Sequence, residues 1–229
     1  MNLLKSLASR LPSTWQWELK RLNYRRQIRR DAFKTSEPEF AILDQLISDG
    51  DWVIDVGANV GHYSKRFSEL VGSQGRVIAF EPVPETFALL AVNAMSFQHH
   101  NLTLLNLAAS DRITVLGMQI PSFDSGLKDY YEASLTARES ELKVMTVALD
   151  LIASDHPVRL IKIDAENHDP IVLNGLEQLL ARDHPTLIIE TSSADAIGKL
   201  EKMGYSHERL ARSPNKLFRW QPPRGGPSL

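Results

Sequence analysis

Two glycines early in the chain have a spacing suited to ligand binding, in Asp55-Val56-Gly57-Ala58-Asn59-Val60-Gly61. They follow an apolar run, where a strand of an open α/β sheet would end and where such sheets bind ligands. Small residues let the backbone approach a ligand, and a following helix offers free N–H groups. The G-x-x-x-G spacing is neither the G-x-G-x-x-G of a dinucleotide site nor a P-loop. It favours a nucleoside-containing ligand without a pyrophosphate, such as S-adenosylmethionine (SAM).

Acidic residues complete this predicted cofactor site. Asp55 could receive the ammonium group of the ligand, directly or through water. Glu81 ends the next expected strand, about twenty residues after Gly61, where a carboxylate can accept both ribose hydroxyls. Alone, the glycines could form a tight turn and Glu81 could be an ordinary strand-end carboxylate, but together they favour cofactor binding. The residues expected to bind the cofactor are Asp55, Gly57, Asn59, Gly61, Tyr63, Glu81 and Ala108, the last within a segment (106–109) that should reach the adenine.

If the ligand is SAM, three side chains that follow a later apolar run could act on a methyl acceptor. Methyl transfer from a sulfonium is an in-line displacement, so the protein must align the acceptor and often remove its proton. Of Asp164, Glu166 and His168, the histidine is best matched to a base near neutral pH. It could equally be a helix-cap or surface histidine, and Asp164 or Glu166 could then orient the acceptor or the cofactor amine. His62 is a second candidate base.

A metal site is also conceivable at this edge of the sheet. Asp164, Glu166 and Glu190 could offer hard oxygen ligands to Mg²⁺. Their spacing specifies no ligand set, and carboxylates beside a cationic cofactor need no metal, so we predict none. The chain has 0 Cys, which excludes disulfides, thiolate metal sites and cysteine nucleophiles.

A parallel sheet is needed to bring these residues together. Apolar runs typical of strands alternate with stretches typical of helices, which predicts an α/β fold with helices on both faces. The expected strands are 52–56, 76–81, 102–107, 160–164, 186–190, 205–210 and 216–220, the last two as an antiparallel pair. The expected helices are 39–47, 63–71, 84–95, 170–181 and 194–203.

An insertion interrupts this alternation before the fourth core strand. Strands are expected at 113–120 and 143–148, separated by a polar stretch, which suggests a hairpin-like flap. It should form much of the acceptor site, where Phe123, Tyr130 and Tyr131 could stack on the acceptor or anchor the loop. The predicted organisation is a basic helical arm (1–36), a catalytic domain (37–221) with the flap at 112–149, and a flexible tail (222–229).

Composition is that of an ordinary globular protein. The chain has 229 residues, of which 43% are hydrophobic and 24% charged. No apolar run approaches the roughly 18 residues of a membrane span. Lys5 and Arg10 interrupt the first stretch too early for a signal-peptide core. We therefore expect a soluble, cytoplasmic protein.

Charge is distributed unevenly. Residues 1–30 carry a net charge of +7 and the remainder −9, which gives the total of −2. This arm could contact a membrane surface, nucleic acid or an acidic partner. The simpler expectation is a solvated helix lying on the acidic body. The body is too acidic for a broad nucleic-acid surface, and we predict no nucleic-acid partner. The apolar contacts of the arm are expected from Trp15, Trp17, Leu19, Leu22 and Tyr24.

In the order of its motifs, the chain resembles the FkbM family of SAM-dependent methyltransferases. The similarity runs from about residue 52 to residue 220 and leaves the basic arm outside. The motifs that carry it are DVGANVGHYS (55–64), FEPVPETFALLAVN (80–93), NLAASD (106–111), VMTVALDLI (144–152), IKIDAENHDPIVLNGLEQLL (161–180), PTLIIE (185–190) and LEKMGY (200–205).

This resemblance implies a Rossmann-like class I methyltransferase with a seven-stranded sheet. It also implies SAM as methyl donor and, usually, O-methylation of a hydroxyl on a sugar or secondary metabolite, so that the partner is a small-molecule or saccharide acceptor. One motif departs from the family: D-x-E-G-x-E is usual, but Asn167 replaces the glycine and Asp169 the second glutamate. Asn tolerates left-handed backbone geometry, so the turn can survive.

Two other functions remain open from the sequence. The acceptor could be an amine, because an amine must also lose a proton before it attacks. The altered fourth motif also allows a non-catalytic SAM-binding module that docks on a partner through the basic arm.

Overall fold

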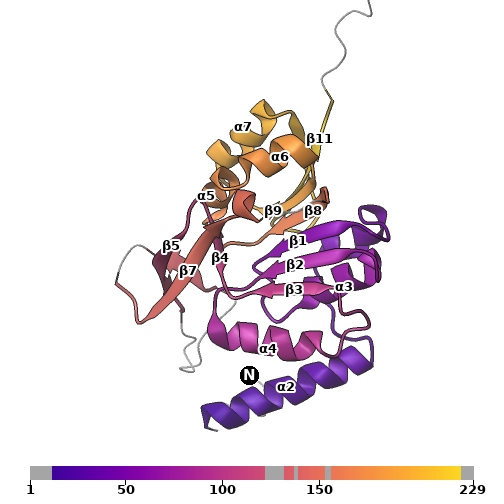
Figure 1. The fold of residues 1–229 in the computed structure, drawn as a ribbon, viewed down its shortest axis with the longest axis vertical. Coiled ribbons are helices and arrows are strands. Elements are labelled where there is room, and N and C mark those ends of the chain that lie inside the picture. The colour runs from indigo at the N-terminus through magenta and orange to yellow at the C-terminus, as the bar shows by residue number, and fades with distance from the viewer. Residues whose placement is uncertain (1–11, 122–131, 137–138, 153–155, 223–229) are drawn as a thin grey trace, which may run out of the picture.

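The computed structural model describes residues 12–121, 132–136, 139–152 and 156–222. Its centre is a seven-stranded sheet with the strand order β10-β11-β9-β8-β1-β2-β3 (Figure 1). The strands from β9 to β3 are parallel, whereas β11 pairs antiparallel with both β9 and β10. This confirms the predicted α/β fold. The strands are β1 (Trp52–Val56), β2 (Arg76–Phe80), β3 (Leu102–Leu105), β8 (Val158–Ile163), β9 (Thr186–Glu190), β10 (Tyr205–Arg209) and β11 (Asn215–Trp220).

Helices cover both faces of this sheet. Alternate residues of each strand point to opposite faces, so β1 supplies Ile54 and Val56 to the core beneath α5, α6 and α7, and Val53 to the core beneath η1 and α3. The helices are α2 (Ser13–Arg29), η1 (Pro38–Gln45), α3 (His62–Val71), α4 (Pro84–Ala94), η2 (Leu149–Leu151), α5 (Asp169–Asn174), α6 (Glu177–Asp183) and α7 (Ala194–Lys202).

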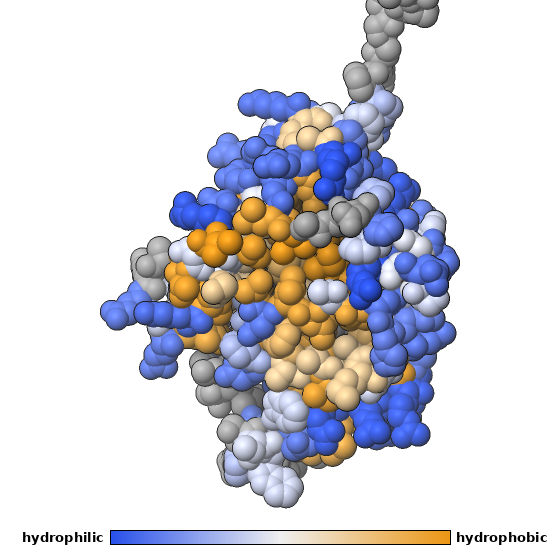
Figure 2. Space-filling view, in the orientation of Figure 1, coloured by the Kyte–Doolittle hydropathy of each residue, from blue (hydrophilic) through white to orange (hydrophobic). Residues whose placement is uncertain are grey.

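The expected insertion is part of a second sheet, with the strand order β4-β7-β5-β6. β5 and β7 pair antiparallel, as a hairpin would, but β7 also pairs in parallel with β4, which directly follows β3. The aromatic residues Phe123, Tyr130 and Tyr131 lie outside the described residues. Figure 2 shows apolar side chains across the middle of this view, over β4, β7 and the neighbouring strands of the large sheet. The strands are β4 (Ala108–Ser110), β5 (Thr114–Gln119), β6 (Ser134–Thr136) and β7 (Leu142–Ala148).

The sequence predicts one helix over 170–181, and this is wrong, because the segment forms α5 and α6 with a break at Gly175. A Cβ on Gly175 would lie 1.9 Å from the carbonyl oxygen of Ser110, so only glycine fits against β4 here. The N–H of Asp150 donates to the Gly175 carbonyl at 2.8 Å. The carboxylate of Asp150 accepts hydrogen bonds from the N–H groups of Gln178 and Leu179 at the start of α6. These tertiary contacts end one helix and begin the next.

The basic arm packs against the body through one face of α2. Trp17, Tyr24 and Ile28 join a core cluster with residues of α4 and the turn after it, so α2 lies on the outer side of α4 (Figure 1). The expectation that five apolar residues of α2 contact the body is wrong for three of them. Trp15, Leu19 and Leu22 are exposed to 65%, 47% and 53%.

Both ends of the chain extend beyond the described residues. Residues 1–11 of the expected arm and 223–229 of the expected tail fall there. Among the helices that the structure does describe, we find none that combines the length and the apolar character needed to cross a bilayer.

Candidate cofactor and acceptor site

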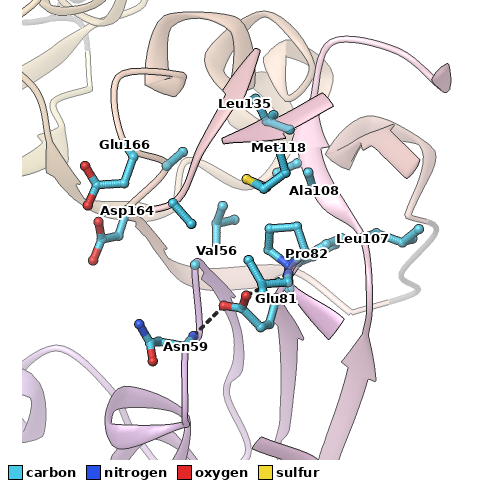
Figure 3. A pocket seen from close by; sticks show the side chains of 16 residues that line it. Val56, Asn59, Glu81, Pro82, Leu107, Ala108, Met118, Leu135, Asp164 and Glu166 are labelled. Carbon is cyan, nitrogen blue, oxygen red and sulfur yellow. Dashed lines mark hydrogen bonds between the residues drawn. The ribbon is translucent and has the colours of Figure 1, made fainter. Parts of the chain in front are cut away.

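A pocket opens at the carboxyl ends of β1, β2 and β8, with the small sheet as its far wall (Figure 3). It is partly enclosed and open to solvent on one side. Its only charged residues, among those described, are three carboxylates: Glu81, Asp164 and Glu166. The remaining lining residues are Val56, Gly57, Asn59, Phe80, Pro82, Val83, Leu107, Ala108, Ala109, Met118, Ala133, Leu135 and Ala165.

Glu81 is held rigidly at this pocket. It directly follows β2, its Oε2 accepts the N–H of Asn59 and its Oε1 accepts the N–H of Val83, each at 2.9 Å. The side-chain amide of Asn106 donates to the carbonyls of Glu81 and Pro82, which fixes the backbone. Each carboxylate oxygen keeps a second lone pair. Burial raises the pKa of Glu81 to about 7, against the lowering effect of the two N–H donors.

The turn after β1 brings Asn59 to Glu81 because its backbone enters the left-handed region. Gly57 and Asn59 have φ of 77° and 50°. Gly57 also packs on the neighbouring strand, where a Cβ would lie 2.0 Å from the backbone oxygen of Asp164. Gly61 lies outside the pocket lining, and a Cβ there would lie 2.7 Å from Leu90 of α4. The first glycine therefore shapes the pocket floor, and the second lets α3 and α4 approach each other.

Asp55 lies beneath the turn and is fully buried. Its Oδ2 accepts the hydroxyl of Ser64 at 2.6 Å, and its Oδ1 has no hydrogen-bond partner among the described atoms. Burial raises the pKa of Asp55, although the nearby charge of Lys162 opposes the shift. Asp55 is outside the pocket lining, so its position supports the turn from below.

Tyr63 is also placed behind the pocket. Its hydroxyl donates to Oε2 of Glu37 at 2.6 Å, and its ring lies under the ammonium group of Lys162, 4.6 Å from Nζ to the ring centroid. Glu37 precedes η1, so this contact ties the segment after the basic arm to α3. Ala108, by contrast, lines the pocket from β4.

Asp164 and Glu166 line the pocket from the turn after β8. Nζ of Lys162 donates to Oδ2 of Asp164 at 2.8 Å. Glu166 and Asn167 have φ of 43° and 68°, so the asparagine takes the left-handed conformation expected of the family glycine. Asp169, in place of the family glutamate, is buried with its Oδ2 unpartnered among the described atoms. The turn thus survives both substitutions, but the shorter acid leaves one oxygen unpaired.

The two histidines considered as bases lie elsewhere. His168 is the N-cap residue that precedes α5, and its Nε2 is 3.1 Å from the hydroxyl of Ser110 in β4. Burial lowers the pKa of His168. His62 stacks on Phe33 at 4.2 Å between ring centroids, and burial lowers its pKa to about 4. Neither lines the pocket, whereas the two carboxylates of the same motif do.

A metal site was considered for Asp164, Glu166 and Glu190. Within the described ranges, no three acidic or histidine side chains are arranged to hold a metal ion. Glu190 ends β9, next to β8, and lies outside the pocket lining.

Lys162 is the important residue that the sequence reasoning missed. It is the largest charged side chain buried in the sheet, at 2% exposure, and it pairs with the pocket residue Asp164. Strand alternation contains the signal, because Lys162 and Asp164 are two residues apart and therefore share a face.

Comparison with known proteins agrees with this geometry. The Methyltransferase FkbM domain matches residues 55–209. No curated protein has a significantly similar sequence. A methyltransferase FkbM from Methylobacillus flagellatus is similar in structure, with 17% identity, a TM-score of 0.51 and coverage of 76% of this chain. The match covers 44% of that protein, so this chain spans less than half of its length.

Two further solved structures are similar to the chain at lower scores. Fibrillarin from Aeropyrum pernix, in complex with natively bound SAM, has 13% identity and a TM-score of 0.49, over 79% of this chain and 73% of that one. An rRNA methylase from Streptococcus thermophilus has 13% identity and a TM-score of 0.47, over 80% and 95%.

The pocket fits the SAM cofactor on its own chemistry. Glu81 presents a carboxylate with two free lone pairs, fixed by backbone N–H groups, as a ribose diol requires. Beside it, Pro82, Leu107 and Ala108 give an apolar wall suited to an adenine ring, and no basic side chain lines the described pocket to repel the sulfonium. The domain match spans more than half of the chain. The chain therefore belongs to the FkbM family of methyltransferases, for which S-adenosylmethionine is the methyl donor.

Proposed function

We propose that the protein is an O-methyltransferase that acts on a hydroxyl group of a sugar or secondary metabolite. The observation that carries this proposal is the charge of the pocket: the only ionisable residues among its described lining are Glu81, Asp164 and Glu166. A phosphate or carboxylate on the acceptor would be repelled, whereas a polyol can donate hydrogen bonds to these oxygens.

Glu81 would bind the cofactor ribose, and Asp164 and Glu166, which line the pocket from the turn after β8, would contact the acceptor. When bound, SAM supplies a methyl group on a sulfonium sulfur, and this sulfur keeps the electron pair of the bond that breaks. The protein has to hold the acceptor oxygen in line and take its proton. We assign the proton to Glu166, which lines the pocket from the turn after β8. Asp164 then orients the acceptor.

The apolar part of the pocket supports an acceptor with a hydrophobic face. Met118 of β5 and Leu135 of β6 line it from the small sheet. A sugar ring has such a face on its C–H side, and so has a hydroxylated aromatic metabolite.

The test is methyl transfer from SAM carrying a labelled methyl group to matched pairs of acceptors. Each pair contains a hydroxyl compound and its amino analogue, such as glucose and glucosamine, or a phenol and the corresponding aniline. We expect label in a methyl ether, identified by mass spectrometry of the product. Methylation of the amino compounds alone would contradict this proposal and favour an N-methyltransferase. SAM binding without transfer to any acceptor would favour a non-catalytic module.

A further inference from the structure

The exposed side of α2 has an apolar ridge without a partner in the described structure. Trp15, Leu19 and Leu22 are spaced four and three residues apart, so they lie on one face of the helix, opposite Trp17, Tyr24 and Ile28. Each of the three is about half exposed or more. α2 is the outermost helix on this side of the molecule (Figure 1), and its 17 residues extend over about 25 Å.

Four arginines lie near the C-terminal end of the helix, three of them on the side of the ridge and Arg25 about a quarter-turn away. All four are exposed, and none forms an ion pair with another residue of the described ranges. By helical spacing Arg26 continues the line from Trp15 through Leu22, whereas Arg29 and Arg30 lie on its two sides. The four residues are Arg25, Arg26, Arg29 and Arg30.

A basic hollow begins where α2 ends. Arg29 and Arg30 line it together with residues of α3 and of the segment before η1. Asp31 and Glu69 neutralise part of the charge, because they pair with Lys34 and Lys65. Five basic residues against these two acids leave the hollow positive: Arg29, Arg30, Lys34, Lys65 and Arg66.

We propose that α2 docks on a membrane surface that contains anionic lipids, with Trp15, Leu19 and Leu22 inserted at the interface and the four arginines on the headgroups. An apolar ridge bordered by arginine is the pattern of helices that lie in the plane of a bilayer, and Trp favours the interfacial region. Clusters of four or more basic residues on such a helix bind anionic headgroups.

Charge complementarity selects this occupant over a second copy of the chain. Two α2 helices packed in parallel through their ridges would bring the arginines of both copies together, which costs binding energy. The remaining chain carries −9 against +7 for residues 1–30, so an anionic surface attracts the arm and repels the body. Nucleic acid would use the arginines, but it would leave Leu19 and Leu22 exposed to water.

The experiment is co-sedimentation of the full-length protein with phosphatidylcholine vesicles, prepared with and without phosphatidylserine. We expect binding to the phosphatidylserine vesicles alone, and weaker binding as salt rises. Removing the ridge or the arginines should each lower the partition coefficient about tenfold or more. The two variants are W15S/L19S/L22S and R25Q/R26Q/R29Q/R30Q.

Matched controls separate docking from general loss of apolar surface or charge. Three apolar residues in or directly before the strands of the small sheet are similarly exposed, and four basic residues are exposed on β7, α7, β10 and the following turn. Their variants, I113S/V115S/M145S and K143Q/K202Q/R209Q/R212Q, should sediment like the wild-type protein. Circular dichroism and SAM titration verify that every variant is folded.

Several outcomes would overturn the proposal. These are no sedimentation of the wild type, equal binding to both vesicle types, or full binding by either α2 variant. Sedimentation velocity could show that the wild type is a dimer and that only the ridge variant is a monomer. This result would assign the ridge to a second copy of the chain. The protein could instead bind a single-stranded RNA probe and no vesicles. If this RNA binding needs the arginines but not the ridge, the helix is assigned to nucleic acid.

Discussion

The ammonium group of Lys162 lies 2.8 Å from Oδ2 of Asp164, and the side chain of Lys162 is only 2% exposed. Burial by itself would lower the pKa of Lys162, but the charges of Asp164 and Asp55 outweigh it, so the pKa is raised and the side chain stays a cation. One buried lysine therefore compensates an acid under the glycine turn and an acid in the pocket.

Replacing Lys162 with Met should destabilise the protein by about 3 kcal/mol, because the two acids lose their buried cation. Methionine has a side chain of similar volume, so the packing is kept. Urea denaturation followed by circular dichroism measures this. Adding Asp55→Asn should recover part of the loss, since the amide needs no counterion. Lys202→Met, at an exposed position of α7, is the matched control and should change little. Equal midpoints for K162M and K202M would contradict the role of the pair.

SAM binding should strengthen as pH rises through about 7. Glu81 has a pKa of about 7 in the free protein, and only its ionised form accepts hydrogen bonds from both ribose hydroxyls. Binding therefore favours loss of the proton, so Kd should fall between pH 6 and pH 8 and level off above.

Isothermal titration at several pH values measures this dependence. Glu81→Gln should weaken binding about a hundredfold at pH 8, since hydrogen bonds to a charged group contribute about 1.5–3 kcal/mol each. It should also remove the pH dependence. A wild-type Kd that is flat over this range would show that Glu81 does not bind the ribose.

Glu166→Gln should lower kcat by about a hundredfold or more while Kd for SAM stays the same, because a general base contributes about 10²–10⁴-fold. His168→Ala should cost less than about tenfold, since its ring contacts Ser110 outside the pocket lining. Single-turnover kinetics with a saturating acceptor compares the two. The reverse order of effects would return the base to His168.

Gly57→Ala should destabilise the protein by about 2 kcal/mol or more. The new Cβ would lie 2.0 Å from the backbone oxygen of Asp164, at a φ of +77°. The control is Gly198→Ala in α7, where a Cβ meets no atom within 4 Å. This control should stabilise the protein by about 0.5–1 kcal/mol. Thermal unfolding measures both, and a shift of the same sign in the two variants would contradict this reasoning.

Local patterns in the sequence predict the part of the site that the chain builds from neighbouring residues. The turn from Asp55 to Gly61 and the carboxylate of Glu81 belong to one βαβ unit, so strand order and spacing suffice to bring them together. Asn167 is predicted as a left-handed substitute for glycine for the same reason, because a turn is a local structure.

What local patterns miss depends on contacts between distant segments. The break between α5 and α6 follows from Ser110 and Asp150, which lie far from Gly175 in the sequence. The ring of His168 is directed to Ser110, 58 residues away, and no spacing rule anticipates it. The exposure of Leu19 and Leu22 depends on which face of α2 meets α4.

The parallel pairing of β7 with β4 joins the insertion to the wall of the cofactor pocket. Ala108 and Ala109 of β4, Met118 of β5 and Leu135 of β6 all line that pocket. If the acceptor binds in this pocket as we propose, a change in the length or sequence of the insertion should alter the affinity for the methyl donor along with the choice of acceptor. Exchanging this segment between relatives should transfer both properties together, and selection on one will constrain the other.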